Sequence, residues 1–374
     1  MDLRLQPADR EGRIQRGASA REHGAVQRDR DVQYEPRRDR HVYGASARLE
    51  KVRGSEGASV MSVSAKIILS VLRAAKKAGL RKGPGTDREA EIRKARAYNR
   101  KHPYREPRDG KACCLTLHAG KYPCLLMKRE KNGLTDKAIL YLHGGGDRDV
   151  WKPEVSFARR YGERAGMDVF YPLYPPFTEA SPEEAADFVF RVYRGIVKRY
   201  GAGAVSVVGG SYGGLLGLQL LSRINGHNAA GERDPVPMPA LMILNSPFAY
   251  PKTEEEWALA ERLEAEDPIL PVGAFRYMLE MTRTAAPDTP DSLLYPADMD
   301  FRGAPETWVF YADEACSAVA EAIRQSYARD GVPDRLHMHI EPGMMHCYAS
   351  APVFRESRRD FDRQIKRLRE EKNV

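Results

Sequence analysis

The chain has 374 residues, which is long enough for one large α/β domain of roughly 250 to 300 residues with extensions. It contains 60 Lys and Arg against 52 Asp and Glu, and its net charge is +8. Because acidic and basic residues are interspersed, we interpret the charge as a solvated surface and expect no nucleic-acid partner. The odd number of cysteines, without a Cys-x-x-Cys pair in a chain that needs no disulfides, favours a reducing compartment. They are Cys113, Cys114, Cys124, Cys316 and Cys347.

The sequence offers no candidate for a membrane-spanning segment, which would need about 20 apolar residues in a row. The longest apolar run, 67–72, begins past residue 60 and is followed by basic residues. A secretory signal has the opposite order, with its positive charge before the apolar stretch. We therefore expect a cytoplasmic protein without stable membrane insertion.

Residues 1–60 are dense in Arg, Asp, Gly, Gln and Ser and show no helical or strand periodicity. Such a segment cannot bury enough apolar surface to offset the entropy of ordering, so it is expected to be disordered. The composition changes abruptly before Met61, and we hypothesise that 1–60 is an upstream region included by a wrong start assignment. A basic arm for nucleic acid is the alternative, but the arginines are nearly matched by acidic residues.

From residue 63 onward the hydrophobic pattern becomes periodic. Apolar spacing predicts helices over 63–80 and 87–98, followed by a β-hairpin with strands 113–117 and 122–127. Strands and helices then alternate, which indicates a mainly parallel sheet with helices on both faces. The predicted strands are 137–142, 168–174, 204–208, 240–245, 306–311 and 335–340, and the predicted helices are 153–165, 181–200, 211–223, 315–329 and one from about 353.

The helix at 181–200 has clear start signals. Ser181 is the expected N-cap, Pro182 occupies the first turn, and Glu184 is expected to close a capping box. Between 247 and about 284 the alternation breaks, and we interpret this insertion as a lid. The inward face of helix 181–200 is expected to hold Phe188, Val192, Ile196 and Tyr200. The inward face of the final helix, from about 353, is expected to hold Phe354, Phe361, Ile365 and Leu368.

Two glycine-rich turns follow predicted strands. Ser211 stands at the centre of a Gly-x-Ser-x-Gly pattern at 209–213, which is typical of a nucleophile elbow. A His-Gly-Gly-Gly loop at 143–146 follows strand 137–142, where it would supply the other half of an oxyanion hole. A phosphate-binding turn is the alternative for 209–214, but a Gly-x-Gly-x-x-Gly fingerprint does not match in register. A plain flexible loop is the alternative for 144–146.

A serine nucleophile needs a base, and the base needs an acid that orients it and stabilises its positive charge. In proteins with such an elbow between a strand and a helix, the three residues follow the order serine, acid, histidine along the chain, each after a strand. Strand 306–311 is followed by Asp313 and Glu314, and strand 335–340 is followed by a loop that reaches His346. We predict Ser211 as nucleophile, His346 as general acid and base, and Asp313 as the orienting acid, with Glu314 as the alternative acid.

These motifs resemble the hormone-sensitive-lipase-like group of α/β-hydrolase esterases, the Abhydrolase-3 type, over about residues 62–372. The resemblance implies an α/β-hydrolase fold with no metal and no organic cofactor. It also implies that the backbone N–H groups of Gly145, Gly146 and Tyr212 form the oxyanion hole, while His143 and Gly144 orient the loop. The segments that carry it are 143–146, 209–213, 312–314 and 342–346, with 245–247 and 295–297 in support.

The sequence departs from the family at Asp147, where an aromatic or small apolar residue usually follows the glycines. A carboxylate beside a hole built for negative charge is expected to lower activity or to re-aim the loop. His337, His339 and Glu341 share one strand face, as metal ligands also do, but we interpret them as the exposed face of an edge strand. No cysteine has a base partner in the sequence, so no functional thiol is expected.

The resemblance implies a serine carboxylic-ester hydrolase that acts on small, short-acyl esters through an acyl-enzyme. A serine peptidase on the same fold and a non-catalytic protein that binds a small molecule are the alternatives. We expect one hydrolase domain over 61–374, with cap elements at about 61–100 and 251–284 above the carboxyl ends of the strands. The sequence predicts no oligomeric state.

Overall fold

The computed structural model describes residues 4–5, 61–78, 88–102, 113–129, 134–146, 152–231, 234–350 and 352–370. Of residues 1–60 it describes only Arg4–Leu5, which form a short strand, β1, that the sequence pattern did not indicate. The expected disorder of the other residues before 61 therefore lies outside the described residues. The same holds for Asp147 and its effect on the loop.

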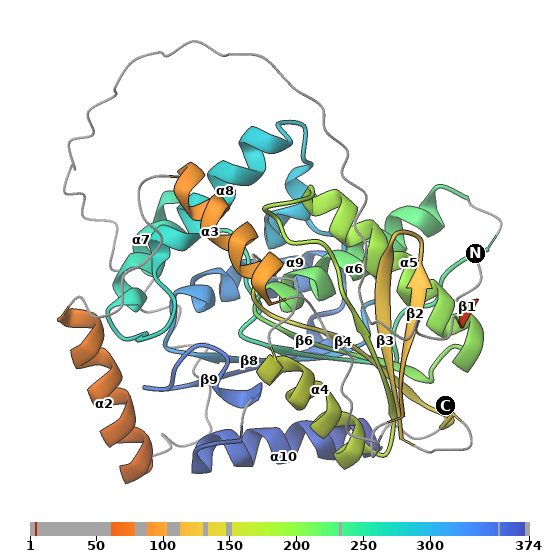
Figure 1. Cartoon of the computed structure of the whole chain (residues 1–374), viewed down its shortest axis with the longest axis horizontal. Helices are drawn as coiled ribbons and strands as arrows, with labels where there is room; N and C mark the ends of the chain where they lie inside the picture. Colours follow the sequence, from red (N-terminus) through yellow and green to blue (C-terminus); the bar gives the residue numbers. More distant parts are fainter. Residues whose placement is uncertain are drawn as a thin grey trace.

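Within the described residues, nine strands form one sheet in the order β1-β2-β3-β5-β4-β6-β7-β8-β9 (Figure 1). The pairs from β1 to β5 are antiparallel, and all pairs from β5 to β9 are parallel. This arrangement confirms the predicted α/β class with a mainly parallel sheet. The strands after β1 are β2 (Cys113–Ala119), β3 (Tyr122–Lys128), β4 (Ala138–Leu142), β5 (Asp168–Pro172), β6 (Val205–Gly210), β7 (Leu241–Asn245), β8 (Glu306–Ala312) and β9 (Leu336–Glu341).

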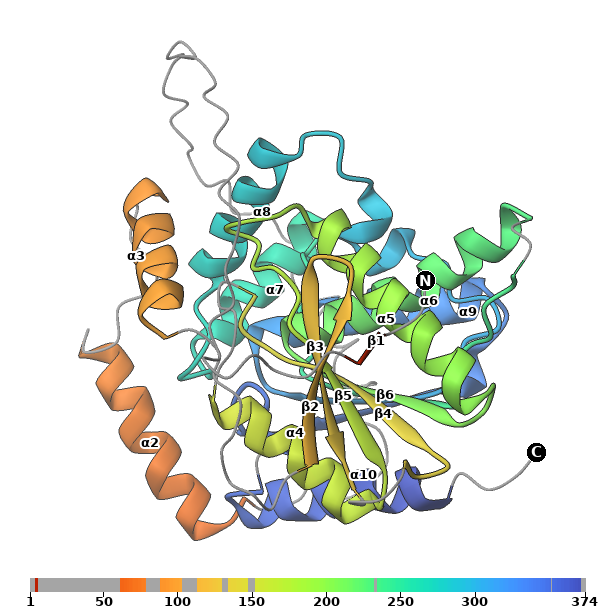
Figure 2. The ribbon, with the colours of Figure 1, turned by 45° about the vertical axis from the view of Figure 1, so that its right-hand side comes forward.

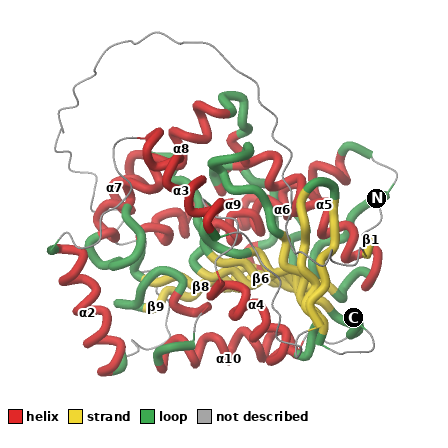
Figure 3. The backbone as a smooth tube through the Cα atoms, viewed as in Figure 1, coloured by secondary structure: helices red, strands yellow, loops and turns green. Residues whose placement is uncertain are grey.

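Helices cover both faces of the sheet, which runs through the middle of the molecule (Figure 3). The helices α4 (Lys152–Ala165) and α10 (Arg355–Glu370) pack together on one face. The other face carries α5 (Pro182–Tyr200), α6 (Tyr212–Ala229) and α9 (Ala320–Arg329). Successive residues of a strand point to opposite faces, so β4 sends Ile139 into one core cluster and Leu140 into the other.

The start of α5 shows how tertiary contacts modify a local signal. Ser181 caps the helix as predicted, and its hydroxyl accepts the Glu184 N–H at 3.2 Å. The Glu184 carboxylate does not close the expected box, because it accepts a hydrogen bond from the Tyr122 hydroxyl at 2.9 Å and pairs with Lys121. A complete capping box forms instead at Thr253 and Glu256. The predicted inward faces of α5 and α10 are buried, except that Tyr200 is half-buried.

Four more helices of the described residues belong to neither of these two layers, although some of their side chains reach the core: α2 (Val63–Lys77), α3 (Arg88–Lys101), α7 (Glu254–Glu264) and α8 (Val272–Ala285). Trp257 of α7 and Phe275 of α8 belong to the core cluster on the α5 side. In contrast, Ala65 and Leu69 of α2 belong to the cluster on the α4 and α10 side. The two expected cap segments thus pack against different clusters, and their role as a common cap stays a prediction.

Short 3₁₀ helices complete the described secondary structure. The predicted helix 315–329 begins as one of them and continues as α9. None of the helices within the described ranges is both long enough and apolar enough to span a membrane. The 3₁₀ helices are η2 (Asp291–Leu293), η3 (Pro296–Asp298), η4 (Ala315–Val319), η5 (Pro333–Arg335) and η6 (Tyr348–Ser350).

Candidate active site

Ser211 lies between β6 and α6 in a conformation that L residues rarely adopt, with φ 51° and ψ −120°. Backbone hydrogen bonds hold it there: its N–H donates to the Asn245 carbonyl and its carbonyl accepts the Phe248 N–H, each at 2.9 Å. A strained serine between a strand and a helix has the geometry of a nucleophile elbow. The structure therefore gives Ser211 the backbone conformation that the sequence motif predicts.

The glycines around Ser211 are required by close backbone approaches. A Cβ on Gly213 would overlap the carbonyl group of Leu142, at the end of β4. A Cβ on Gly214 would lie 2.6 Å from the Cα atom of Pro247, which follows β7. The first turn of α6 thus fits between the ends of the two neighbouring strands only if positions 213 and 214 carry no side chain.

The glycine loop that follows β4 packs directly against this elbow. A Cβ on Gly144 would lie 3.3 Å from the Cβ atom of Ser211, and Gly145 has a positive φ of 70°. A Cβ on Gly146 would lie 2.8 Å from the ring of Tyr212. The structure therefore brings together the residues predicted to form the oxyanion hole.

His143 is fully buried behind this loop. Its ring stacks on Tyr174 with centroids 4.1 Å apart, and its Nδ1 lies 2.8 Å from the Gly144 carbonyl oxygen. Because a carbonyl oxygen only accepts, Nδ1 must carry the proton. Burial lowers the pKa of His143 to about 4, although the bond to Gly144 opposes this effect. A neutral ring that donates to the loop agrees with the predicted orienting role.

Glu154 is a buried acid in the first turn of α4 that sequence reasoning missed. Its Oε2 accepts the Tyr141 hydroxyl at 2.7 Å, and the Gly144 N–H donates to the same carboxyl group. Burial raises its pKa, and these two hydrogen bonds oppose that effect. An acidic residue at this position of a helix is normally explained by the helix dipole, so the sequence holds no signal for this contact.

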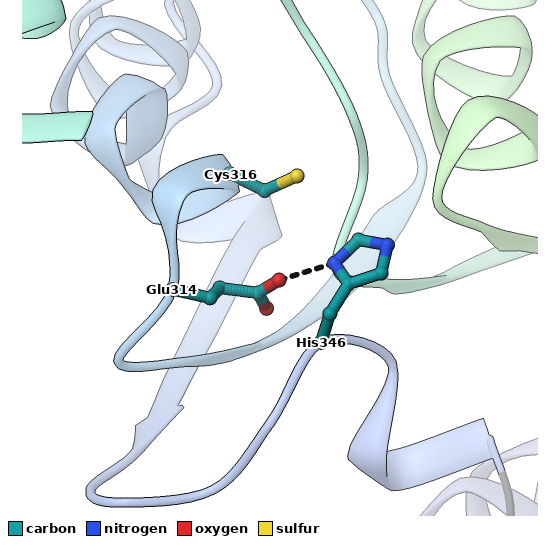
Figure 4. A group of neighbouring side chains, drawn as sticks. All are labelled: Glu314, Cys316 and His346. Atoms are coloured by element: carbon teal, nitrogen blue, oxygen red, sulfur yellow. Dashed lines mark hydrogen bonds and ion pairs between the residues drawn. The ribbon is translucent and has the colours of Figure 1, made fainter. Parts of the chain in front are cut away.

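The structure pairs His346 with Glu314 and not with Asp313. The Nδ1 atom of His346 is hydrogen-bonded to the Glu314 carboxylate (Figure 4). The Asp313 carboxylate instead accepts the Gly343 N–H at 3.1 Å. Because Glu314 has an extended backbone, consecutive side chains point to opposite sides, and only one of the two acids faces the ring. The geometry thus corrects the expected pairing in favour of the alternative acid.

Further contacts fix the Glu314 side chain, which is completely buried. Its Oε1 accepts the Ser246 hydroxyl and also the Ala312 N–H at 3.1 Å. The Ser246 oxygen in turn accepts the Cys347 N–H at 2.8 Å. Ser246, at the end of β7, therefore joins the acid to the histidine loop, a role that its place in the 245–247 motif did not reveal.

The environment of His346 favours its charged form. Burial lowers the pKa of the ring, but the negative charge of the neighbouring Glu314 carboxylate opposes this effect, and the pKa lies well above the ordinary value. A Cβ on Gly210, the residue before Ser211, would lie 4.0 Å from the sulfur of Cys347. The histidine loop therefore lies beside the elbow.

Two thiols lie near this ring. Cys316 is completely buried, and burial raises its thiol pKa to about 12, so it is protonated at neutral pH. Ligand atoms of Glu314, Cys316 and His346 lie within 4.8 Å of one another, but the acid and the ring already bond to each other (Figure 4). The acid and the ring thus use these ligand atoms for a hydrogen bond to each other.

A second group of metal-ligand types joins His339 and Glu341 on β9 to Asp360 on α10. Arg359 lies between the acids, with its Nη2 atom 2.6 Å from Glu341 and 2.7 Å from Asp360. The guanidinium of Arg359 neutralises the two carboxylates and takes the position that a metal ion would occupy between them. Glu341 is buried, which differs from its expected place on an exposed face, because α10 covers this end of the edge strand. His337 stays outside the group and lies 2.5 Å from Glu306.

Comparisons with known proteins agree with the fold described above. Residues 139–350, more than half of the chain, match a family model described as alpha/beta hydrolase fold, Abhydrolase_3. This match confirms the family resemblance that the motifs indicated. No curated protein matches the sequence of the chain.

Solved structures share the fold at low sequence identity. EstE5, in crystals soaked with p-nitrophenyl butyrate, is 20% identical with a TM-score of 0.64, covering 83% of this chain and 99% of its own. An esterase/lipase from an uncultured bacterium is 19% identical with a TM-score of 0.63 and the same coverage. An esterase from the bacterial hormone-sensitive lipase family is 19% identical with a TM-score of 0.62, covering 84% of this chain and 99% of its own. The family match and the nine-stranded sheet together show that this chain belongs to the alpha/beta hydrolase fold family.

Proposed function

We propose that this protein is a serine carboxylic-ester hydrolase with the triad Ser211, His346 and Glu314. The observation that carries the proposal is the hydrogen bond between His346 Nδ1 and the buried Glu314 carboxylate. This bond leaves Nε2 as the atom that accepts the serine proton, because an imidazole has only two ring nitrogens. The strained conformation of Ser211 supports its role as nucleophile.

In the proposed reaction, Ser211 Oγ attacks the ester carbonyl while Nε2 of His346, in the neutral form that prevails above its raised pKa, takes the serine proton. The backbone N–H groups of Gly145, Gly146 and Tyr212 stabilise the oxyanion, and Glu314 stabilises the imidazolium. The imidazolium then gives its proton to the leaving alcohol, and the acyl group stays on Ser211. A water molecule, deprotonated by His346, then attacks the acyl carbon, the bond to Ser211 Oγ breaks, and the imidazolium returns the proton to Oγ as the carboxylic acid leaves. The chemistry needs no metal or organic cofactor.

The proposed substrates are small esters with short acyl chains, and the proposed location is cytoplasmic. The substrate class follows the likeness to esterases, one of which was soaked with p-nitrophenyl butyrate. The location follows the cysteine usage, which suits a reducing compartment.

The test is hydrolysis of p-nitrophenyl esters from acetate to palmitate, combined with labelling by diethyl p-nitrophenyl phosphate. The proposal predicts the highest kcat/KM at acetate or butyrate and one diethylphosphoryl group, located on Ser211 by peptide mass spectrometry. A protein that neither turns over these esters nor takes the label would instead be a non-catalytic member of the fold. Labelling without ester turnover, but with cleavage of peptide substrates, would indicate a peptidase.

A further inference from the structure

The large apolar side chains that the described part of the chain exposes to solvent lie in one place. Four are on α2, and the fifth comes just before α10. Their exposed fractions are high. A single exposed apolar side chain is normal on a protein surface, but a cluster of them is not. They are Val63 (73%), Ile67 (60%), Ile68 (44%), Val71 (63%) and Val353 (59%), and we call them the α2 patch.

Contacts at both ends of α2 fix the direction in which this patch faces. At the start, the Ser62 N–H donates to the Glu356 carboxylate of α10 at 2.5 Å. At the end, Arg73 donates to the Gly343 carbonyl at 2.9 Å, and Lys76 donates to the Asp267 carbonyl at 2.8 Å. The helix lies along the side of the molecule, with its first turn next to the start of α10 (Figures 1 and 2).

The same contacts divide the helix into two faces. Ala65 and Leu69 point into the core and are completely buried. Val63, Ile67 and Val71 follow each other at intervals of four residues, which places them in one stripe on the opposite side. Since the inner face is used for packing, the outer stripe belongs to a surface that the described residues do not cover.

The charges around the stripe are positive. The helix α2 contains no acidic residue, and Lys66 and Lys77 are exposed near its two ends. Arg355 and Arg358 are also exposed and lie close to Val353 in the sequence, and Arg358 Nη1 donates to the Val353 carbonyl at 3.1 Å. Glu264 and Glu266 balance the two cations that dock the helix, Lys76 and Arg73.

We propose that the α2 patch docks onto an anionic lipid bilayer surface. A helix with an apolar stripe and flanking lysines lies in the plane of the headgroups, where its side chains enter the acyl region and its lysines meet lipid phosphates. With 15 residues, α2 is shorter than the ~20 residues needed to span, so the docking is peripheral. A second copy of the chain fits less well, because self-pairing of the patch would bring the same positive charges together.

The experiment measures co-sedimentation of the full chain with vesicles. One set contains phosphatidylcholine alone, and the other contains equimolar phosphatidylcholine and phosphatidylglycerol. We expect binding to the anionic vesicles that weakens at high salt, and at least about tenfold weaker binding to the neutral ones. The double variant Ile67→Ser with Val71→Ser is expected to lower the partition coefficient at least about tenfold, because two aliphatic side chains no longer enter the bilayer.

Charge variants separate electrostatic docking from general stickiness. Lys66→Gln with Lys77→Gln is expected to weaken anionic binding about tenfold. The matched control, Lys198→Gln with Arg199→Gln, removes the same charge from α5 and is expected to bind like the wild type. Circular dichroism and the thermal midpoint verify folding, and Ser211→Ala is expected to bind vesicles normally, so the result does not depend on catalysis.

Three outcomes would overturn the proposal. The first is that the protein sediments with neither kind of vesicle. The second is that it binds neutral and anionic vesicles equally, or that the α2 and α5 charge variants lose the same amount of binding. The third is a dimer in light scattering that Ile67→Ser with Val71→Ser abolishes, which would assign the patch to self-association.

Discussion

The two halves of the candidate site differ in what holds them in place. Around Ser211, the glycines that the motif requires are explained by backbone approaches such as that of Gly213 to the carbonyl group of Leu142. Around His346, the acid is selected by side chains from distant segments, including Ser246, 68 residues before Glu314. The elbow is thus encoded in a short run of sequence, whereas the choice between two adjacent acids is made only by the folded chain. The following predictions test that contrast.

The largest effect is expected from Ser211→Ala. Removal of the nucleophile should lower kcat for p-nitrophenyl butyrate on the order of 10⁵- to 10⁶-fold, with little change in the thermal midpoint. The control is Ser350→Ala, whose hydroxyl lies 3.7 Å from the position of a Cβ on Gly210 and has no role in the proposed reaction. If the two variants keep similar activity, Ser211 is not the nucleophile.

The next effect is expected from Glu314→Gln. Loss of the charge that stabilises the imidazolium should lower kcat on the order of 10³- to 10⁴-fold. Asp313→Asn should cost less than about tenfold, because the Asp313 carboxylate accepts the Gly343 N–H, whereas the His346 ring is hydrogen-bonded to Glu314. Steady-state kinetics of the two variants decide between neighbouring acids, and the reverse ranking would restore Asp313 as the orienting acid.

A smaller effect is expected from Gly146→Ala. The new methyl group would lie 2.8 Å from the Tyr212 ring, which is buried, so the loop must move away from the elbow. We expect kcat to fall on the order of 10²- to 10³-fold, as for loss of one oxyanion donor. Gly226→Ala in α6 is the matched control, since among the described residues its added methyl group would meet no atom within 4 Å beyond its chain neighbours and the backbone of its own helix. Equal activity of both variants would argue against the oxyanion role of this loop.

The smallest effect is expected at Glu154. Glu154→Ala leaves the Tyr141 hydroxyl and the Gly144 N–H without their acceptor, so the free energy of unfolding should fall by about 1 to 3 kcal/mol. The loosened loop should lower kcat about tenfold with little change in KM. Glu154→Gln keeps an acceptor oxygen and should restore most of the kcat, while exposed Glu163→Ala on the same helix should change neither quantity. Equal kcat in all three variants would mean that Glu154 does not position the loop.

The sequence was most informative about features that depend on short-range geometry, namely the strands and helices, the buried face of a helix and the elbow at Ser211. Alternating strands and helices predicted the parallel sheet, and the spacing of Phe361, Ile365 and Leu368 predicted the buried face of α10. The elbow could be predicted as well. A Cβ at its glycines would collide with atoms within a few residues of Ser211 or at the end of a neighbouring strand.

The sequence was least informative where partners come from distant segments. The Glu184 carboxylate bonds to Tyr122 and Lys121 of the hairpin in place of its own helix end. The Glu154 contact depends on how α4 packs beside the glycine loop, and Glu314 depends on Ser246 and His346. A residue's type and spacing do not specify such contacts, because each requires the complete fold.

The most direct test of the proposed triad is a ¹⁵N NMR titration of the His346 ring in the wild type, Glu314→Gln and Asp313→Asn. The structure places the wild-type pKa well above the ordinary histidine value, although burial opposes the charged form, and the Glu314 carboxylate contributes to the increase. Loss of that charge should therefore lower the pKa of His346 in Glu314→Gln, and it should stay near the wild-type value in Asp313→Asn. A lowered pKa in Asp313→Asn with an unchanged one in Glu314→Gln would contradict the assignment of Glu314 as the partner of His346.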